Sequence, residues 1–318
     1  MKGLAWIQNF EKFDDFSLQS FEFENLLDGF VRVAVKAIGV NRADILQRRG
    51  LYPAPKGVCA NIVGLEIAGE VIDAGNSAWK VGDRVMTILA GGGYASHVQV
   101  HHSHLLQIPD HLSFIEGAAI PENFLTAFDA LYCQCKLDRH QSVMIHAIGS
   151  GVGDAAAQIL SVFGNSVIAT SRSQNKVEEA LRRGLSAFRI MDGCFPSDLP
   201  KVDCILDFVG GAYFQQNLQQ LKKNGQLMIV GLLGGLSANI NLGLVLSQNL
   251  TVRGSTLRSR SIQEKALLIQ KFQNTLLPYF EQQILHPTIF QTLDWKDAPI
   301  AHQLMIANQN YGKIVLVL

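Results

Sequence analysis

Two hydrophobic patterns divide the chain. In the first third, apolar and polar residues alternate over short stretches, and from Phe30 to Val40 valine or alanine occupies the odd-numbered positions 31 to 37. An alternation with a period of two is typical of a strand that is buried on one face. Glycine-containing turns separate three more such runs, which predict strands at Ile67–Ile72, Arg84–Leu89 and Ala95–Val100. We therefore expect a small β-barrel or sandwich in this part of the chain.

The pattern changes after residue 113. Helical spacing over Phe114–Tyr132, interrupted at Pro121, leads into strands that alternate with helices. The predicted strands are Ser142–His146, Ser166–Thr170, Ala187–Ile190, Val202–Phe208, Gln226–Val230 and Leu250–Arg253. The predicted helices are Ala155–Val162, Asn175–Arg183 and Ala212–Leu221. Six strands with helices between them are typical of a doubly wound parallel sheet.

A last apolar run, Ile314–Leu318, has no parallel partner left in that sheet, so we assign it to the first domain. The predicted fold class is therefore α/β, with a doubly wound (Rossmann) parallel sheet inserted in a β-rich domain. We expect residues 1–121 and 259–318 to form the β-rich domain. Residues 122–258 are expected to form the inserted one.

Composition narrows the function. Of the 318 residues, 48% are hydrophobic, and 27 basic residues balance 27 acidic ones, so charge favours neither nucleic acid nor a membrane surface as partner. No apolar run reaches the roughly 20 residues that a membrane span needs. The five cysteines are odd in number and only Cys133 and Cys135 are close, which favours reduced thiols in the cytoplasm over a disulfide framework.

The segment from His146 to Gly153 is the strongest functional motif. It joins a predicted strand to a predicted helix, and Gly151, Gly153 and Ala156 fit the spacing G-x-G-x-x-A. Glycines at such a turn let the backbone approach a dinucleotide pyrophosphate, which the helix N-terminus then binds. The predicted cofactor contacts here are Ser150, Gly151, Val152 and Gly153. The alternative is a helix-capping turn without a ligand.

The end of the second predicted strand indicates which dinucleotide binds. NAD sites usually carry an acidic residue there, but this chain has Ser171 and Arg172, with Lys176 following. A guanidinium beside hydroxyl groups suits a 2′-phosphate, so we predict NADPH as the cofactor. The alternative is that Arg172 and Lys176 are ordinary solvated residues. Gly231 follows the fifth strand, where a small residue leaves room for ribose and nicotinamide.

These motifs and several others occur in one family. The others are Val40–Asp44 with Gln47–Pro53, Gly64–Gly69, Gly82–Val85, Gly92–Ala95, Ala119–Glu122 with Leu125–Ala127, Thr256–Arg260 and Asn310–Leu316. The chain resembles the medium-chain dehydrogenase/reductase superfamily, in its zinc-free NADPH:quinone oxidoreductase (zeta-crystallin-like) family. The resemblance runs nearly end to end. It implies a GroES-like catalytic domain built from both chain ends, bound NADPH and a homodimer.

The resemblance also addresses metal binding. Zinc-dependent relatives carry Cys where this chain has Asn41 and His where it has Leu65, and neither Asn nor Leu can replace those ligands. The lobe of closely spaced cysteines that binds a structural zinc is also missing. We therefore expect no metal site. The histidines at positions 101, 102 and 104 are expected to be solvated surface residues.

The resemblance assigns catalytic roles to Asn41 and Tyr52, beside the nicotinamide and the acceptor. Asn41 is expected to orient the ring or the acceptor carbonyl, whereas Tyr52 is either a proton donor or only an aromatic wall. The resemblance places Thr126, Asn310 and Lys313 near the cofactor. The alternatives are a packing threonine and a solvated lysine.

Four further charged residues carry predictions. Arg258 and Arg260 either close over a ligand or belong to a charged loop. Glu66 is expected to bind a backbone group or an arginine. Asp154 is expected to face solvent, because a carboxylate that turned toward the pyrophosphate would repel it.

The predicted activity is hydride transfer from NADPH to a quinone without a metal, because quinones are electrophilic enough to accept hydride unaided. A reductase of enoyl groups or α,β-unsaturated carbonyls on the same fold is the first alternative. A protein that binds NADPH without turnover is the second.

Overall fold

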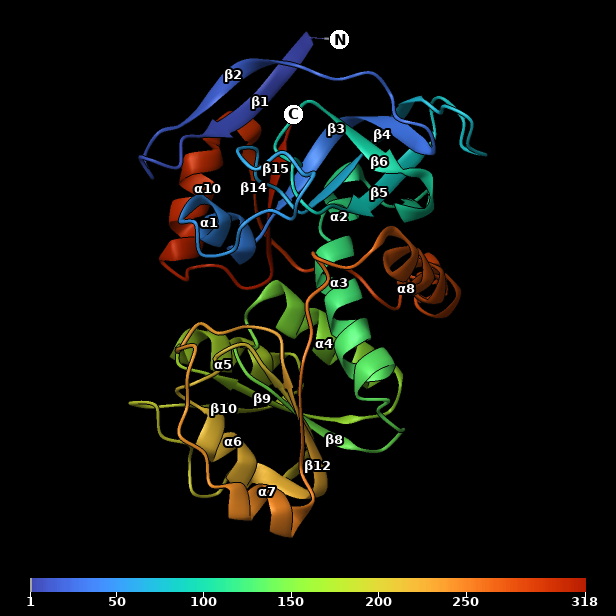
Figure 1. The fold of residues 1–318 in the computed structure, drawn as a ribbon. Coiled ribbons are helices and arrows are strands. Elements are labelled where there is room, and N and C mark those ends of the chain that lie inside the picture. Colours follow the sequence, from blue (N-terminus) through green and yellow to red (C-terminus); the bar gives the residue numbers. More distant parts are fainter. Residues whose placement is uncertain (1) are drawn as a thin grey trace. The chain divides into compact units, whose positions relative to one another are not determined.

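Both ends of the chain build one compact unit, and its middle builds another. The computed structural model describes residues 2–318. The first unit contains Met1–Leu125 and Leu257–Leu318, and the second contains Thr126–Thr256 (Figure 1). After the roles that the resemblance implies, we call them the catalytic unit and the nucleotide unit. The domain boundaries predicted after residues 121 and 258 stay predictions.

The central element of the catalytic unit is β3 (Phe30–Val40), the longest strand. It pairs antiparallel with β4 (Glu66–Asp73), β6 (His97–His101) and β15 (Lys313–Val317). The order of the seven-stranded sheet is β14-β15-β3-β4-β5-β7, with β6 paired to β3 off this path. The remaining strands are β5 (Arg84–Ile88), β7 (Leu105–Gln107) and β14 (Ile289–Asp294), and β1 (Lys2–Gln8) pairs with β2 (Phe16–Glu22) in a separate two-stranded sheet.

The assignment of the last strand to the first domain is confirmed, because Ile314 pairs with Val40 on β3. Its other neighbour, β14, was not predicted and runs parallel to it. In the first part of β3, Val31, Val33 and Val35 are buried in the main core and Lys36 is exposed, whereas all residues from Ala37 to Val40 are buried. The alternation that predicted this strand therefore corresponds to one side facing the interior.

Short helices surround this sheet. They are α1 (Arg42–Arg48), α2 (Phe114–Gly117), α3 (Pro121–Phe128), α8 (Ile262–Thr275), α9 (Leu277–Glu281) and α10 (Ala298–Ile306). A capping box starts α1, in which the Asp44 carboxylate accepts the backbone N–H of Asn41 at 2.8 Å. The cap fixes Asn41 at the junction between β3 and α1.

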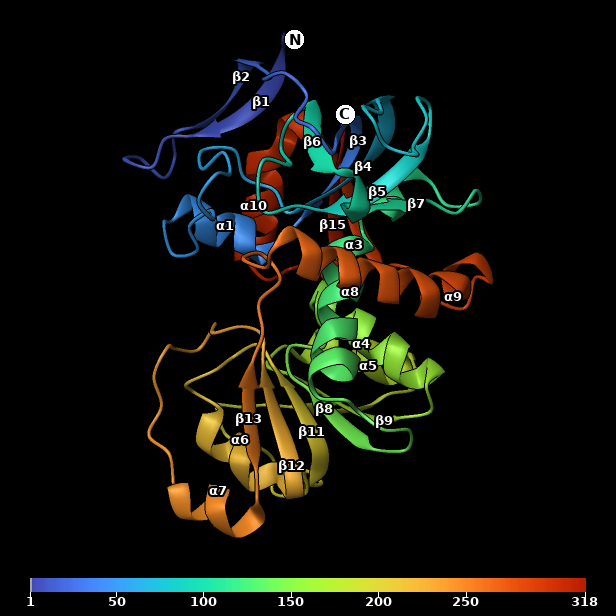
Figure 2. The same cartoon turned by 45° about the vertical axis from the view of Figure 1, so that its right-hand side comes forward.

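The nucleotide unit is a six-stranded parallel sheet in the order β10-β9-β8-β11-β12-β13. Its strands are β8 (Ser142–Ile145), β9 (Ser166–Ser171), β10 (Ser186–Arg189), β11 (Val202–Asp207), β12 (Leu221–Ile229) and β13 (Thr251–Gly254). In chain order this is 3-2-1-4-5-6, the order of a dinucleotide-binding sheet, so the predicted fold class is confirmed. Figure 2 shows β13, β12 and β11 as adjacent parallel arrows.

Four helices cover this sheet. The contacts of α4 (Gly151–Val162) and α5 (Gln174–Arg182) are with strands β8 to β10, whereas α6 (Phe214–Gln220) and α7 (Leu242–Gln248) contact β12. A π-helix, Asp129–Gln134, follows α3. The sequence did not predict α7, which has no buried residue.

Candidate active site

The glycine turn leads from β8 into the first turn of α4. Ser150 is the N-cap residue, and its hydroxyl oxygen accepts the backbone N–H of Gly153 at 3.0 Å. A Cβ atom on Gly153 would lie 2.9 Å from the carbonyl oxygen of Ala147, and one on Gly149 would lie 2.5 Å from the Lys176 side chain. These glycines therefore keep the turn compact and free of side chains. Helix α4 is long enough to offer its N-terminus to a phosphate.

The residues predicted to choose the dinucleotide lie at the end of β9. Ser171 is buried at the last position of the strand, Arg172 is exposed, and Lys176 is buried on α5 against Gly149. The structure thus brings Lys176 to the glycine turn, so its description as an ordinary solvated residue is wrong.

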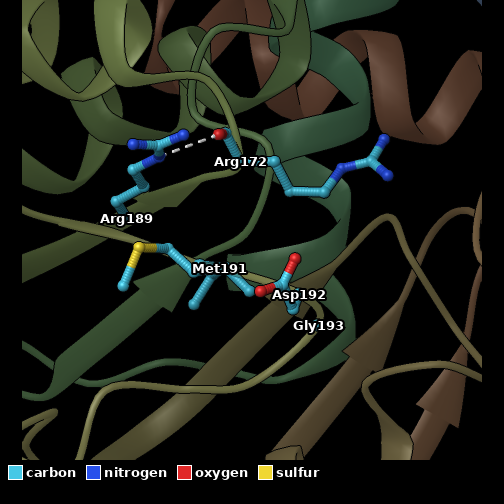
Figure 3. A pocket seen from close by; sticks show the side chains of 6 residues that line it. Arg172, Arg189, Met191, Asp192 and Gly193 are labelled. Atoms are coloured by element: carbon cyan, nitrogen blue, oxygen red, sulfur yellow. Dashed lines mark hydrogen bonds between the residues drawn. The ribbon is translucent and has the colours of Figure 1, made fainter.

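A pocket of about 500 Å³ opens beside the same strand end. Its lining comprises Arg172, Arg189, Ile190, Met191, Asp192 and Gly193. Figure 3 shows that the two arginines extend in different directions, and Arg189 Nε donates a 3.4 Å hydrogen bond to the backbone oxygen of Arg172. The pocket therefore has two cationic groups on its wall.

A buried chain of polar groups crosses the sheet at the ends of β9, β8 and β11. Thr170 Oγ1 lies 2.6 Å from His146 Nδ1, and His146 Nε2 lies 2.7 Å from the amide oxygen of Asn217. Asn217 donates in turn to the carboxylate of Asp207 at 3.1 Å. Burial lowers the pKa of His146 to about 4, so its ring is neutral at physiological pH. The chain fixes the positions of the strand ends around the glycine turn.

Asp207 also shapes the loop that follows β11. Its carboxylate accepts the backbone N–H groups of Val209 and Gly210, and burial raises the pKa of Asp207 to about 6. A Cβ atom on Gly231, the predicted cofactor contact after β12, would lie 2.9 Å from the carbonyl oxygen of Phe208. The two loops pack backbone against backbone, which requires glycine at position 231 whether or not a ligand binds.

In the catalytic unit, Asn41 and Lys313 are in direct contact. Lys313 Nζ donates to Asn41 Oδ1 at 2.7 Å and to Asn123 Oδ1 at 3.2 Å, and it forms an ion pair with Glu66. Lys313 is 2% exposed and Glu66 is completely buried, so the description of Lys313 as a solvated charge is wrong. Three oxygen acceptors match the three protons of the ammonium group. We call Asn41, Glu66, Asn123 and Lys313 the ammonium cluster.

The amide of Asn41 is largely occupied within this cluster. Its Nδ2 group donates to Glu66 Oε1 at 2.8 Å and to the carbonyl oxygen of Gly39 at 3.2 Å, while Oδ1 accepts from Lys313. Only one lone pair of Oδ1 is left for another partner. The predicted role of Asn41 toward a ring or carbonyl stays a prediction, and these contacts restrict how it can be fulfilled.

Glu66 holds a backbone group, as predicted. Its Oε2 accepts the N–H of Glu122, the second residue of α3, at 2.9 Å. Its cationic partner is Lys313 rather than an arginine. Glu66 therefore ties β15 and the start of α3 to β4.

Tyr52 follows α1 in a loop that Arg258 holds in place. The Arg258 guanidinium lies 4.9 Å from the centre of the Tyr52 ring and donates to the backbone oxygens of Tyr52 and Ala90, each at 2.7 Å. It also donates to the side chain of Gln47. Arg258 is buried and three of its five N–H donors are engaged, so the description of it as part of a charged surface loop is wrong, while its closure over a ligand stays a prediction.

Two other predicted cofactor contacts differ in their surroundings. Thr126, on α3, has a buried hydroxyl oxygen that no hydrogen-bond partner within residues 2–318 reaches. A buried orphan hydroxyl is a candidate contact for a ligand. Asn310 is buried and donates to the carbonyl oxygen of Gly312 at 2.8 Å, inside the turn that precedes Lys313. Asn310 thus shapes this turn.

Sequence reasoning missed a second buried chain, next to Asn41. Asp44 accepts from Tyr94 Oη at 3.2 Å, Tyr94 Oη lies 3.0 Å from His302 Nε2, and Arg48 Nη1 lies 2.8 Å from His302 Nδ1. Burial raises the pKa of Asp44 to about 7 and lowers that of His302 to about 3. Asp44 lies on α1, His302 on α10 and Tyr94 in the segment before β6, so only the tertiary fold brings these distant parts of the sequence together.

Glu122 was also missed as a site residue, although its motif was recognised. Burial, more than any neighbouring charge, raises the pKa of this carboxyl to about 8. The signal in the sequence was a single acid in the otherwise apolar run from Gly117 to Phe128 that also contains Asn123. An isolated charge in such a run is typical of a functional position.

Two expectations are wrong. Asp154 does not face solvent, since it is 5% exposed and its carboxylate accepts from Gln158 at 2.9 Å and pairs with Arg183 at 3.1 Å. Its carboxylate therefore bonds within the protein, to a residue of α4 and to Arg183, and not to solvent. His104 is buried, and its Nε2 lies 3.0 Å from the carbonyl oxygen of Ile262. The helix α8 covers this histidine, which the local sequence could not show.

Comparison with known proteins shows which family the chain belongs to. Residues 28–110 match the alcohol dehydrogenase GroES-like domain, and residues 151–274 match the zinc-binding dehydrogenase family. The quinone oxidoreductase-like protein 2 homolog of Nematostella vectensis is 29% identical over 309 residues, which cover 93% of this chain and 84% of that protein. The chain belongs to the medium-chain dehydrogenase/reductase superfamily. Its relatives place it in the quinone oxidoreductase-like family.

Two further similarities are to a solved enoyl reductase and to a segment of a polyketide synthase. The structure of the CurK enoyl reductase superposes with a TM-score of 0.87 at 25% identity, and 99% of each chain is covered. A segment of the polyketide synthase GfsB of Streptomyces halstedii is 30% identical over 296 residues, covering 92% of this chain. The chain spans only 5% of that synthase.

Family membership makes the protein an oxidoreductase that uses a nicotinamide cofactor. Within residues 2–318, none of the helices combines the length and the apolar character needed to cross a bilayer.

Proposed function

We propose that this protein is an NADPH:quinone oxidoreductase that works without a metal ion. The ammonium cluster is the observation that carries the proposal. Where zinc-dependent relatives would carry a thiolate, the amide of Asn41 bonds to the buried ammonium of Lys313. Without a Lewis acid the acceptor must itself be electrophilic, and quinones are.

The donor set does not fit a zinc ion. Zinc sites use thiolate, imidazole or carboxylate ligands, but here the neighbours of Asn41 are an ammonium group, another amide and a carboxylate already paired with that ammonium. A second cation beside Lys313 would meet repulsion at short range. No group of three or more His, Cys, Asp or Glu side chains within residues 2–318 is arranged to hold a metal.

The nucleotide unit fits a phosphorylated dinucleotide. At the start of α4 the N–H of Gly153 is taken by the Ser150 hydroxyl, so Gly151 and Val152 are the residues whose backbone N–H groups suit a pyrophosphate. Arg172 at the end of β9 supplies the fork of donors that binds a 2′-phosphate, with Ser171 and Lys176 nearby. Arg189 adds a second guanidinium on the wall of the same pocket.

In the mechanism that we propose, the bound cofactor supplies hydride, and the protein binds, orients and excludes water. The buried ammonium cluster holds Asn41 rigid at the start of α1. Arg258 fixes the loop of Tyr52, whose ring is a wall for a flat acceptor. Such fixed positions account for rate acceleration by orientation rather than by covalent chemistry.

A panel of acceptors tests the proposal. Purified protein is mixed with NADPH and with naphthoquinones, benzoquinones, enones or an enoyl thioester, and loss of NADPH absorbance is followed. We expect NADPH to be oxidised far faster with quinones than with enones. Treatment of the protein with a chelator should not lower the rate with quinones.

A second candidate, reduction of enoyl groups, is favoured by the similarity to the CurK enoyl reductase. Turnover with the enoyl thioester but not with quinones would establish it instead. Tight NADPH binding with no oxidation by any acceptor would indicate a binding protein without turnover, and would end both enzymatic proposals.

We also propose that the protein is a homodimer in the cytoplasm. The edge strand β13 is exposed along its length, and α7, the helix that precedes it in the chain, exposes Leu242 and Leu246 at 68% and 84%. An open parallel edge flanked by apolar side chains is suited to a symmetric partner. All five cysteines are free, as expected for a reducing compartment.

A further inference from the structure

One carboxyl group beside the ammonium cluster has no hydrogen-bond partner. Glu122 lies in the first turn of α3, and its backbone N–H donates to Glu66. Its carboxyl oxygens accept nothing from residues 2–318, although the side chain is only partly exposed. The next residue, Asn123, accepts from Lys313. The fold therefore places a carboxyl group without a hydrogen-bond partner at the edge of the ammonium cluster.

The other polar groups of the site are already committed or sealed. Lys313 has three acceptors, and the amide hydrogens of Asn41 are both donated within the protein. Asp44 is completely buried and accepts from Asn41 and Tyr94. The carboxyl of Glu122 can therefore bond to a substrate without giving up a hydrogen bond, whereas the ammonium of Lys313 and the amide hydrogens of Asn41 cannot.

Charged and titratable groups face Glu122 from several elements. Two acids, Glu66 on β4 and Asp44 on α1, disfavour its ionised form, and two lysines, Lys313 on β15 and Lys265 on α8, favour it. Tyr52 and Arg258 act on it from their loops. Burial dominates and raises the pKa of the Glu122 carboxyl to about 8, so the group carries its proton at neutral pH.

We propose that Glu122 is the general acid of the reaction and gives its proton to the acceptor oxygen that becomes a hydroxyl group. This inference rests on the proposed quinone reduction. One carbonyl oxygen of the quinone would take a hydride, with its electron pair, from the C4–H bond of a reduced nicotinamide, which would become oxidised, and the other oxygen would be left as an anion. The second carbonyl oxygen takes the proton of the Glu122 O–H bond. The carboxylate of Glu122 then regains a proton from water, and a quinone has become a hydroquinone.

Tyr52 is the competing proton donor. Burial raises the pKa of its hydroxyl above the ordinary value near 10, which makes it a weaker acid at neutral pH. A general acid is most effective when its pKa lies near the working pH. Glu122 meets this condition, and Tyr52 is left as an aromatic wall of the acceptor site.

The test compares Glu122→Gln, which keeps the size of the side chain but removes its acidity, with a surface control. Glu281, exposed at the end of α9, provides the matched control Glu281→Gln. We expect Glu122→Gln to lower kcat about 100-fold or more, with the Kd for NADPH, measured by fluorescence, within a few-fold of wild type. Glu281→Gln should match wild type in both.

The pH profile separates proton donation from a structural role. Wild-type kcat should fall as the pH rises through about 8, because Glu122 must be protonated to act. Glu122→Gln should lack this fall, and Glu122→Asp should retain part of the rate together with a fall at high pH. Tyr52→Phe should lose only a few-fold and keep the wild-type profile.

Three results would overturn the inference. The first is a Glu122→Gln rate within a few-fold of wild type, and the second is a reduced rate that still falls at high pH. The third is loss of that fall in Tyr52→Phe, which would make Tyr52 the acid. If the wild-type protein reduces no quinone, the proposed function itself fails and this role fails with it, so the two failures are distinguishable.

Discussion

Replacing Lys313 with methionine should strongly destabilise the catalytic unit. Lys313 is 2% exposed and its partner Glu66 is completely buried, so the substitution leaves a carboxylate inside the protein without its counter-charge. The acceptors Asn41 Oδ1 and Asn123 Oδ1 lose their donor as well. Breaking a buried ion pair by removing one partner typically costs about 3–5 kcal/mol, and we expect Lys313→Met to fall in this range.

Tryptophan fluorescence can measure the unfolding of the catalytic unit. All three tryptophans, Trp6, Trp79 and Trp295, belong to the catalytic unit, so their fluorescence during urea unfolding reports on that unit alone. Lys271→Met, at an exposed position of α8, is the matched control and should change the free energy of unfolding by no more than about 0.5 kcal/mol.

A double-mutant cycle shows whether the pair is the cause. Glu66→Gln alone should also destabilise the unit, and the double variant should cost about 1–3 kcal/mol less than the sum of the single ones. If Lys313→Met lowers the free energy of unfolding by less than about 1 kcal/mol, the reasoning is refuted, because a buried carboxylate without its counter-charge should destabilise the unit by more than that.

Three further predictions concern the cofactor, the assembly and pH. Arg172→Glu should weaken NADPH binding far more than NADH binding in fluorescence titrations, and an equal loss for both would contradict a 2′-phosphate site. Val252→Asp, on the exposed edge strand β13, should convert a dimer to a monomer in analytical ultracentrifugation; an unchanged mass would rule out this edge as the interface. The raised pKa values of Asp44 and Glu122, about 7 and about 8, mean that their protonated forms are favoured by folding. Their contribution to stability is therefore complete in acid and is lost as the pH rises through these values. The lowered pKa values of His146 and His302 act in the opposite sense up to about pH 6.5, so the urea midpoint should fall between about pH 7 and pH 8.5. A midpoint that rises over this interval would contradict the assignment.

Much of the fold follows from the sequence, because its periodicity is strong where elements are buried on a regular face. All six strands of the nucleotide unit were predicted, and the assignment of β15 to the other sheet is confirmed. Two of the missed elements, β14 and α7, have weak patterns. Most positions of β14 are exposed, and α7 has no buried residue, so neither has a regular apolar face for a pattern to reveal.

The site was predictable only where function leaves a local motif. The glycine turn was visible because its strand, loop and helix are consecutive in the sequence. The contact between Lys313 and Asn41 joins residues that are 272 positions apart, so only a family resemblance indicated that they share a site. Asp44, Tyr94 and His302 likewise come from three distant segments, and no spacing in the sequence indicated that they are in contact.

The position of β15 within the sheet has a consequence for biosynthesis. The strand lies between β14 and β3, and its first residue carries the ammonium group that neutralises Glu66. As the ribosome makes the protein, the segment up to Leu125 must therefore wait, with an incomplete sheet and an unpaired buried acid, until residues near 317 emerge. The nucleotide unit is continuous in the chain and can close first. Nascent catalytic units should thus depend on chaperones during translation, while the inserted unit should not.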